Sequence, residues 1–338
     1  MLEIEIHGNI GFIILNRVKA LNALSVAMIV KMYNTLQEWQ ADDAIAAVVI
    51  KSKQNTVFCA GGDIKALYAI RDTPIDELMS FFKLEFKLNY LLHTYPKPII
   101  TLMNGLVMGG GVGIGMHNCL PIAGENMLCA MPETKIGLFP DVGSSHVLHK
   151  LPLAWRNYVG LFGAKLTTPE LCAFKLVAAY IPTINWDDFL NCLIDGKQSI
   201  TAAIDAFKQM PSAPIHQIEE EWRLAAPTFA ELMNNIEQAR TAEIVKIQQQ
   251  LTSFSPLSLV VTFEKLQLSQ RFNLQECLQQ DYQLMYHFMK KSDFFEGVRA
   301  MMIDKDKHPH WLYQDWHEVP YALVQTFQEK HCKLFDML

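Results

Sequence analysis

Several features that would assign this chain of 338 residues to a common class are absent. No stretch concentrates lysine and arginine, and 29 basic against 35 acidic residues give a net charge of −6. A nucleic-acid partner is therefore not expected, because binding to phosphates requires a basic patch. Charged residues make up only 19% and hydrophobic residues 50%, which excludes a disordered or low-complexity chain.

Cysteine pairs and targeting signals are also missing. The seven cysteines are an odd number, lie far apart and form no CxxC motif, which predicts reduced thiols rather than disulfides or a zinc site. The N-terminus shows neither the pattern of a signal peptide nor an Arg- and Ser-rich transit segment. We therefore expect a cytoplasmic bacterial protein, or a mitochondrial matrix protein whose transit peptide was trimmed.

One stretch without charge, between Lys97 and Glu125, is long enough to span a bilayer. Prolines, asparagines and several glycines interrupt it, however. A buried strand, a glycine turn and a close-packed helix explain this composition better, so no membrane partner is expected.

Strand and helix patterns alternate over roughly the first 190 residues, which predicts an α/β fold with helices covering sheets. We expect strands over 2–6, 12–15, 47–50, 57–60, 99–102, 120–123 and 127–130, and helices over about 26–40, 74–93 and 109–116. Ser25 is expected to cap the first helix, and Thr167 and Glu170 to form a capping box. From about residue 186 only helical patterns remain. This predicts a core over 1–200 and a helical C-terminal region over 201–338, with a soft boundary.

Motifs for nucleotides, nucleophilic serine and metals are absent. The glycines of 109–115 do not fit the G-x-G-x-x-G spacing, and the chain has no P-loop and no G-x-S-x-G. The pairs His146/His149 and His308/His310 have no carboxylate or thiolate to complete a metal site, so we expect solvated or capping histidines. Four aromatic side chains could form a ligand patch, although helical core is favoured: Trp311, Tyr313, Trp316 and Phe327.

Two glycine turns follow predicted strands, at 58–63 and 108–111. Glycine lets a ligand approach the backbone closely, and the first N–H groups of a following helix have no intrahelical partner. Two such N–H groups aimed at one oxygen would form an oxyanion hole. The alternative is that these are simply tight turns that allow close helix packing.

The segment 131–143, MPETKIGLFPDVG, carries a carboxylate near each end, Glu133 and Asp141, among apolar residues. Burial there would raise the pKa of either group and make it a better base. Alternatively, both side chains cap backbone in an exposed loop, and Lys135 could pair with either. The residues alone thus allow an enzyme that stabilises an oxyanion and uses one or two carboxylates, with no metal implied.

Together these segments resemble the crotonase (enoyl-CoA hydratase/isomerase) superfamily. Residues 15–24, LNRVKALNAL, are similar to its N-terminal signature, and 58–65 and 104–113 are similar to its two oxyanion turns. Such a resemblance implies a crotonase spiral of ββα turns with a helical C-terminal region.

Within the superfamily, the segment 131–143 resembles the active-site segment of the 3-hydroxyisobutyryl-CoA hydrolase family. Residues 293–300, DFFEGVRA, and 303–309, IDKDKHP, are similar to its C-terminal signature, and 255–259 also fits. The resemblance covers roughly residues 2–325. It implies hydrolysis of a β-hydroxyacyl-CoA, with 3-hydroxyisobutyryl-CoA first and 3-hydroxypropionyl-CoA second, in valine breakdown.

The resemblance also implies roles for individual residues. The thioester oxygen would lie between the N–H groups of Gly62 and Gly110, which form the oxyanion hole. Glu133 would be the catalytic glutamate and Asp141 its partner acid, and Glu85 would contact the substrate. Glu133 would either activate water or attack directly to give a mixed anhydride. Coenzyme A enters as part of the substrate, so no separate cofactor is implied.

Contacts to coenzyme A are expected beside the two turns. Arg17, Lys19 and Lys65 are candidates for the phosphates, although exposed basic residues are usually only solvated. The other residues expected to bind the coenzyme are Ala20, Leu21, Asp63 and Ile64. Relatives in the superfamily form trimers and hexamers, so a homo-oligomer is allowed, whereas a C-terminal region folded over its own active site would favour lower order.

One position separates the activities of the superfamily. Hydratases carry a second catalytic glutamate three residues after the middle glycine of the second turn, and here that position is Gly113. Hydrolysis is therefore favoured, with a hydratase or isomerase and a non-catalytic acyl-CoA-binding protein as alternatives. Ser144-Ser145 replaces the glycine-rich, aromatic sequence usual in the hydrolases, which leaves the acyl preference open: a hydroxyl there could bond a polar acyl group or cap the helix.

Overall fold

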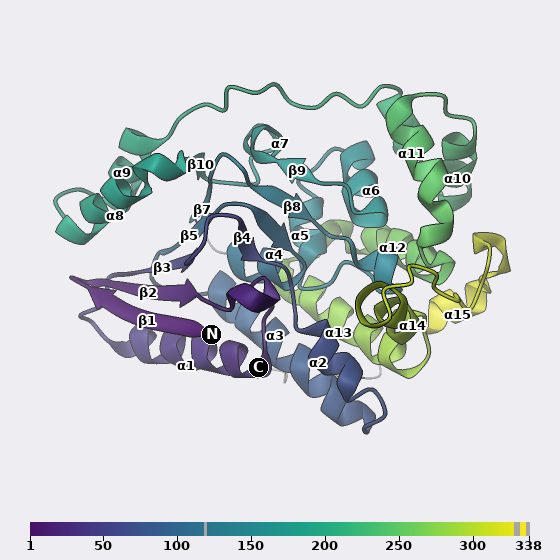
Figure 1. The fold of residues 1–338 in the computed structure, drawn as a ribbon, viewed down its shortest axis with the longest axis horizontal. Helices are drawn as coiled ribbons and strands as arrows, with labels where there is room; N and C mark the ends of the chain where they lie inside the picture. The colour runs from purple at the N-terminus through teal and green to yellow at the C-terminus, as the bar shows by residue number, and fades with distance from the viewer. Residues whose placement is uncertain (118–119, 328–331, 336–338) are drawn as a thin grey trace. The chain divides into compact units, whose positions relative to one another are not determined.

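The computed structural model describes residues 1–117, 120–327 and 332–335 (Figure 1). The chain forms two compact units, each built from three stretches. The first unit contains 1–62, 87–129 and 166–215, and the second contains 63–86, 130–165 and 216–338. The division into a core over 1–200 and a helical region over 201–338 stays a prediction.

The strands belong to two sheets. The larger sheet has the order β1-β2-β3-β5-β7-β10, in which β1 and β2 are antiparallel and every other pair is parallel. Its strands are β1 (Leu2–His7), β2 (Ile10–Leu15), β3 (Ala47–Ser52), β5 (Ile99–Met103), β7 (Leu120–Ala123) and β10 (Ala179–Tyr180). The smaller sheet has the order β4-β6-β8-β9, namely β4 (Val57–Cys59), β6 (Leu106–Met108), β8 (Leu128–Ala130) and β9 (Leu166–Thr167).

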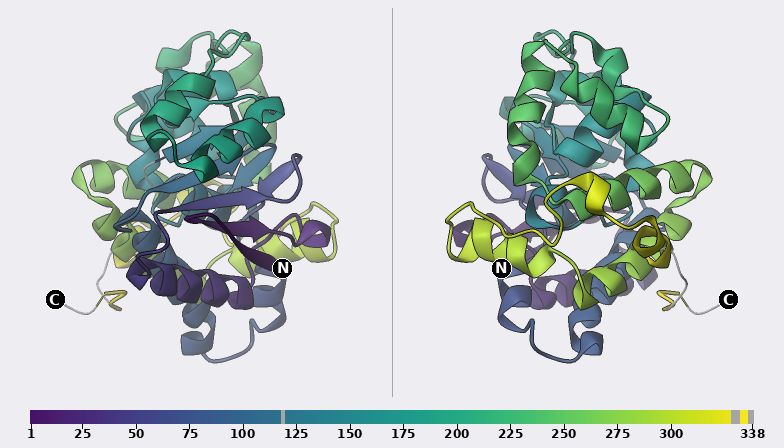
Figure 2. Two further views of the ribbon diagram at one scale, coloured as in Figure 1. Left: turned by 90° about the vertical axis from the view of Figure 1, so that its left-hand side faces the viewer. Right: turned by 90° about the vertical axis from the view of Figure 1, so that its right-hand side faces the viewer.

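Helices cover both faces of the larger sheet (Figures 1 and 2). On one face, α8 (Trp186–Asp195) and α9 (Ile200–Phe207) bury apolar side chains against β2, β3, β5, β7 and β10. On the other face lies α1 (Val26–Ala41), which comes after β1 and β2 in the sequence. A Cβ built on Gly11 would lie only 2.5 Å from the ring of its Trp39. Two short helices, α4 (Gly110–Gly115) and α7 (Thr168–Ala173), also belong to the first unit.

The second unit is mainly helical, and α3 (Ile75–His93) begins in it and ends in the first unit. Its early helices are α2 (Ile64–Ala69), α5 (Ser144–Leu148) and α6 (Leu153–Phe162). The later ones are α10 (Phe229–Glu237), α11 (Ala242–Gln250), α12 (Pro256–Leu268), α13 (Leu274–Lys290), α14 (Phe294–Val298) and α15 (Tyr321–Thr326). Within the described ranges, no strand follows Tyr180, as the sequence pattern predicts.

Local predictions are confirmed at the helix starts. The Ser25 side chain accepts the N–H of Met28 at 3.3 Å, and Thr167 and Glu170 form the expected capping box. Six cysteines are free thiols, and the seventh, Cys119, lies outside the described residues. No helix in the described part of the chain has the length and apolar character needed to cross a membrane.

Candidate active site

The first glycine turn is hydrogen-bonded to the loop of the N-terminal signature within the first unit. The buried Asn22 amide donates to Phe58 O at 2.9 Å, and its oxygen accepts the N–H of Arg17 at 2.8 Å. Two backbone bonds join the same segments, from Ala60 N–H to Leu21 O and from Leu24 N–H to Gly61 O. Asn22, whose role the sequence does not reveal, thus fixes the turn that leads to Gly62.

The second glycine turn lies directly against the first. It follows β6, which pairs in parallel with β4, so the carboxyl ends of both strands lie at the same edge of the smaller sheet. A Cβ built on Gly61 would lie 3.6 Å from the nitrogen of Gly110, and one on Gly111 only 2.4 Å from Cys59 O. As the first residue of α4, Gly110 has an N–H without an intrahelical acceptor. The first unit therefore brings together the two turns that were predicted to hold the oxyanion.

The side chain of Asn89 fills the space at the position of the missing glutamate. A Cβ on Gly113 would lie 2.7 Å from Nδ2 and 2.8 Å from Oδ1 of Asn89, which is fully buried. A glutamate at 113 would therefore collide with this amide. Both amide atoms lack a hydrogen-bond partner among the described residues, so the side chain that lies against Gly113 is a neutral polar group and not a carboxylate.

The residues predicted to bind coenzyme A fall into both units. In the first unit, Lys19 and Ala20 lie in the 3₁₀ turn Val18–Ala20, and Leu21 follows with a positive φ of 50°. In the second unit, Asp63 is the N-cap of α2, and its carboxylate accepts the N–H of Ala66 at 3.2 Å. Ile64 and Lys65 form the first turn of that helix. Their contacts with a coenzyme stay predictions.

The segment of Glu133 is held by the C-terminal signature within the second unit. The 3₁₀ turn Glu133–Ile136 ends at Gly137, whose φ is +70° and whose Cβ would lie 2.4 Å from Asp293 O. A Cβ on Gly297 would likewise lie 2.4 Å from the Ile136 carbonyl. The two glycines allow backbone-to-backbone packing between the turn and α14, so this part of the signature positions Glu133.

Three carboxyl groups of the second unit form a buried cluster. Glu85, Glu133 and Asp141 are 2%, 7% and 6% exposed, so the alternative of an exposed loop is wrong. Burial and the charge of Asp141 hold the pKa of both Glu85 and Glu133 well above the usual value. Burial, reinforced by Asp281, raises the pKa of Asp141 to about 7. Because buried groups of like charge disfavour joint ionisation, the cluster retains protons near neutral pH.

This burial predicts a pH-dependent gain in stability from Asp141→Asn. The folded pKa of Asp141 lies above its unfolded value, so the native protein binds more protons and loses stability as pH rises through about 7. The variant should exceed the wild type in free energy of unfolding by about 4 kcal/mol near pH 8, with no difference near pH 4. Urea unfolding at both pH values checks this, and a difference that is independent of pH would contradict it.

Several buried polar atoms of the cluster, and of the helix that begins just after Asp141, have no hydrogen-bond partner among the described residues. They are Oε1 of Glu85, Oε2 of Glu133 and the hydroxyl oxygens of Ser144 and Ser145. Both serines are fully buried in the first turn of α5, whose N-cap is Gly143, so neither hydroxyl caps the helix. Buried polar groups are normally hydrogen-bonded, and an unpaired set of this kind indicates a place for a polar ligand or water.

The cation of this cluster is not the one that the sequence suggested. The Lys135 nitrogen lies over the Phe254 ring at 5.1 Å, and burial lowers its pKa. The ion pairs of the described residues include none between Lys135 and Glu133 or Asp141. Instead Lys265, from α12, lowers the pKa of both Glu133 and Asp141. Sequence reasoning missed it, although it falls one helical turn after the buried Val261 on an apolar face.

His149 is the C-cap residue of α5, and its partly buried ring forms hydrogen bonds through both nitrogens. Ser269 donates its hydroxyl proton to Lys265 O and receives a bond from Nε2 of His149 at 3.0 Å. Nδ1 then accepts from Arg156 at 3.0 Å, so the ring is neutral, and burial lowers its pKa to about 4. No group of three or more His, Cys, Asp or Glu side chains in the described part of the chain could hold a metal ion.

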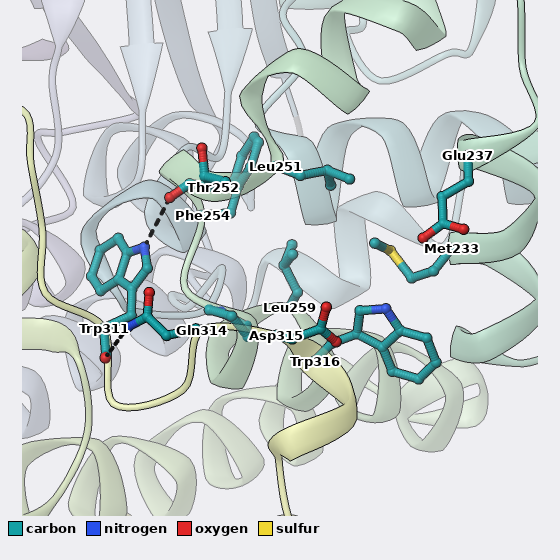
Figure 3. Close-up of a pocket in the computed structure, with 11 residues that line it drawn as sticks. Met233, Glu237, Leu251, Thr252, Phe254, Leu259, Trp311, Gln314, Asp315 and Trp316 are labelled. Atoms are coloured by element: carbon teal, nitrogen blue, oxygen red, sulfur yellow. Dashed lines mark hydrogen bonds between the residues drawn. The ribbon is translucent and has the colours of Figure 1, made fainter.

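The aromatic residues of the C-terminal region are partly core and partly pocket wall. Trp311 is buried and donates to Thr252 O at 3.3 Å, and Phe327 packs on Phe288. Trp316 lines a pocket of about 170 Å³ together with Trp311, Met233 and Glu237 (Figure 3). None of the residues predicted for catalysis or for binding of coenzyme A lines this pocket.

Comparison with known proteins gives two sets of relatives. A family model described as enoyl-CoA hydratase/isomerase matches residues 10–328. The mitochondrial 3-hydroxyisobutyryl-CoA hydrolase of Danio rerio is 35% identical over 316 residues, which cover 90% of this chain and 83% of the relative. For 3-hydroxyisobutyryl-CoA hydrolase 1 of Arabidopsis thaliana, the identity is 33% over 348 residues, with 97% and 91% covered.

Two solved structures that resemble this chain carry other names. An enoyl-CoA hydratase from Rhodobacter sphaeroides 2.4.1 superposes with a TM-score of 0.90 at 32% identity, covering 97% of this chain and 96% of its own. A carnitinyl-CoA dehydratase from Mycobacterium thermoresistibile gives a TM-score of 0.91 at 28% identity, with 99% and 98% covered. The fold is thus shared by proteins named as hydrolases, as a hydratase and as a dehydratase.

Proposed function

This chain belongs to the enoyl-CoA hydratase/isomerase family and has its crotonase fold, and we propose that it hydrolyses the thioester of 3-hydroxyisobutyryl-CoA to 3-hydroxyisobutyrate and coenzyme A. The observation that carries this proposal is the contrast between its two units. The second unit buries Glu133 and Asp141 in one carboxyl cluster, whereas Gly113 and Asn89 of the first unit offer no second hydratase carboxylate. The curated hydrolases of similar sequence support acyl-CoA thioester hydrolysis.

In the proposed reaction, the N–H groups of Gly62 and Gly110 bind the thioester oxygen and stabilise the negative charge that develops on it. Glu133 then acts by one of two routes. As a base, it takes a proton from water, whose oxygen adds to the carbonyl carbon, and the C–S bond breaks as the intermediate collapses. As a nucleophile, its carboxylate oxygen adds directly, coenzyme A thiolate leaves, and water hydrolyses the mixed anhydride.

The raised pKa values suit the remaining proton transfers. A protonated carboxyl can donate to the departing thiolate or hydrogen-bond the 3-hydroxyl of the acyl group, and an ionised one can accept from that hydroxyl. We propose that Asp141, whose pKa is about 7, donates the proton to the departing thiolate. Glu85, whose pKa is also raised, would form the hydrogen bond with the 3-hydroxyl. The family resemblance implies that both residues, like Glu133, contact the substrate.

The proposal is tested by measuring free-thiol release from 3-hydroxyisobutyryl-CoA, with hydration of crotonyl-CoA run beside it. Rapid thiol release with negligible hydration is the expected result. Hydration without thiol release would mean that another group replaces the carboxylate absent at Gly113. Binding of both esters without any turnover would identify an acyl-CoA-binding protein.

The unpaired serine hydroxyls predict a preference for hydroxylated acyl groups. Ser144→Ala and Ser145→Ala should each lower kcat/KM for 3-hydroxyisobutyryl-CoA by about 10-fold, the worth of a hydrogen bond of roughly 1.4 kcal/mol. Activity on isobutyryl-CoA, which lacks the hydroxyl, should change little. Equal losses on both esters would show that the serines do not contact the acyl hydroxyl.

We further propose that this hydrolysis serves valine breakdown, because the sequence relatives are named as hydrolases of 3-hydroxyisobutyryl-CoA. The bacterial cytoplasm as location and a homo-oligomeric state stay predictions, and so does the absence of a separate cofactor.

A further inference from the structure

The turn that carries Asp141 has an unusual backbone. Val142 follows it with a φ of +52°, in the left-handed region that a β-branched residue rarely adopts, and Gly143 has a φ of +71°. Val142 is fully buried. Such a conformation persists only where the surrounding structure holds it, so the contacts of this turn determine where the Asp141 carboxylate lies.

Two residues far along the sequence hold the turn from both sides. Lys265 of α12 donates from Nζ to the carbonyl of Pro140, directly before Asp141. Asp281 of α13 accepts the N–H of Gly143 at 2.7 Å, directly after Val142. The same two side chains form an ion pair at 2.8 Å, with side chains 1% and 0% exposed.

A buried ion pair is weak evidence for stability, because desolvation offsets the attraction between the charges. Hydrophobic residues would fill this space at similar or lower cost. The pair instead places one positive and one negative charge next to the carboxyl cluster. Lys265 lowers the pKa of Asp141 and Asp281 raises it, so the two charges act on Asp141 in opposite directions.

The other ionisable groups around the turn belong to different elements of the second unit. Glu133 and, from α3, Glu85 complete the carboxyl cluster. Cys277 faces Asp281 and Lys265 from α13, with a pKa raised to about 12 by burial. His149 lies within the field of Lys265 and is neutral above about pH 4. Between about pH 5 and 9, the charges that act on Asp141 are therefore those of its cluster and of the pair.

We propose that Lys265 and Asp281 are positioning residues of the active site, which hold the strained turn of Asp141 and balance the charge of the carboxyl cluster. This inference rests on the proposed function of Asp141 in hydrolysis. The role requires both the two backbone contacts and the two opposite charges, which can be removed separately.

Four variants separate geometry from charge. Lys265→Met removes the donor and the charge, whereas Lys265→Gln keeps an N–H donor for Pro140 without the charge. Asp281→Asn keeps an oxygen that can accept the Gly143 N–H. The double variant Lys265→Gln/Asp281→Asn forms a neutral, hydrogen-bonded pair, which should fold even where a single variant leaves an unpaired buried charge.

The variants are expected to differ in the size of the loss in kcat and in the direction in which the pH profile shifts. Lys265→Met should lower kcat by about 10²-fold with a smaller change in KM, because a small displacement of a reacting group costs that much. Lys265→Gln should move the descending limb of the kcat–pH profile, which follows the protonated form of Asp141, to higher pH, and Asp281→Asn should move it to lower pH, each by about one unit. The double variant should return the limb close to its wild-type position.

A purely structural pair would lower stability without these opposite shifts. The matched control is Lys97→Met, since Lys97 also donates to two backbone carbonyls, those of Trp39 and Asp42, in the first unit. It should lower the thermal midpoint and leave the pH profile unchanged. Shifts in the same direction, or none, in folded Lys265→Gln and Asp281→Asn would overturn the proposal.

A substrate-free readout separates this proposal from the proposed function. In protein labelled with ¹³C at aspartate carboxyls, the resonance absent from Asp141→Asn reports the titration of Asp141. Its midpoint should rise in Lys265→Gln and fall in Asp281→Asn. If the wild type releases no thiol from any acyl-CoA ester but these shifts occur, the function is wrong and the pairing stands. If hydrolysis occurs and the midpoint stays fixed, only the pairing is wrong.

Discussion

Replacing Glu133 with glutamine is expected to abolish turnover of 3-hydroxyisobutyryl-CoA while the protein still binds the ester. A positioned acid or base contributes up to about 10⁴-fold, and a carboxamide can neither accept the proton of water nor attack the thioester. The change is nearly isosteric, and it removes a carboxyl whose pKa is raised by burial, so stability should not fall. Single-turnover thiol release and binding of the ester by calorimetry measure the two quantities.

Glu125→Gln is the matched control for this variant. Glu125 lies on the surface of the first unit, where it accepts two hydrogen bonds from Thr183. It should lose some stability and keep the wild-type rate. Near-normal turnover in Glu133→Gln would remove Glu133 from the mechanism. An isotope experiment extends the test: in ¹⁸O-water, label that enters the Glu133 side chain would indicate the anhydride route.

The second large effect is expected from a methyl group between the glycine turns. Gly111→Ala would place its Cβ 2.4 Å from Cys59 O, a backbone atom that cannot yield without moving β4. The N–H of Gly110 would then lose its alignment with the first turn. Loss of one oxyanion donor typically lowers kcat by about 10²–10³-fold, and we expect a fall of this size in thiol release.

Gly196→Ala provides a comparison at a glycine with no functional neighbour. Gly196 has a φ of +63° and no atom within 4 Å of a built Cβ, so alanine there adds backbone strain but no collision. We expect about 1 kcal/mol of lost stability and an unchanged rate. A Gly111→Ala enzyme that is folded and fully active would exclude the oxyanion role of these turns.

Much of the fold and the candidate site could be predicted because local patterns carry them. Alternation of apolar and charged residues predicted β1, and short apolar runs predicted most of the other strands. The turn glycines stand directly after β4 and β6. Glu133 and Asp141 were found because both lie in one short apolar segment. Whether that segment is buried could not be predicted, since the residues that cover it, such as those of α14, come from about 160 positions further along the chain.

Lys265 and Asp281 show why the remainder could not be predicted. Each lies in an amphipathic helix, where a charged residue is normally solvated. Only the tertiary packing of α12 and α13 brings them to Pro140 and Gly143. A lysine on the apolar face of α12 was the one available signal. The contact of Asn89 with Gly113 could not be predicted either, because it depends on the tertiary packing of α3 against α4.

The packing of Gly137 and Gly297 has a consequence for synthesis of the protein. The turn of Glu133 rests on a segment that leaves the ribosome about 160 residues later. At about 5–20 residues per second, the turn spends roughly 8–32 s without its support, even though the strands before it are complete. A nascent or truncated chain that ends before Asp293 therefore carries Glu133 on an unsupported backbone. Activity should appear only when the last part of translation is finished.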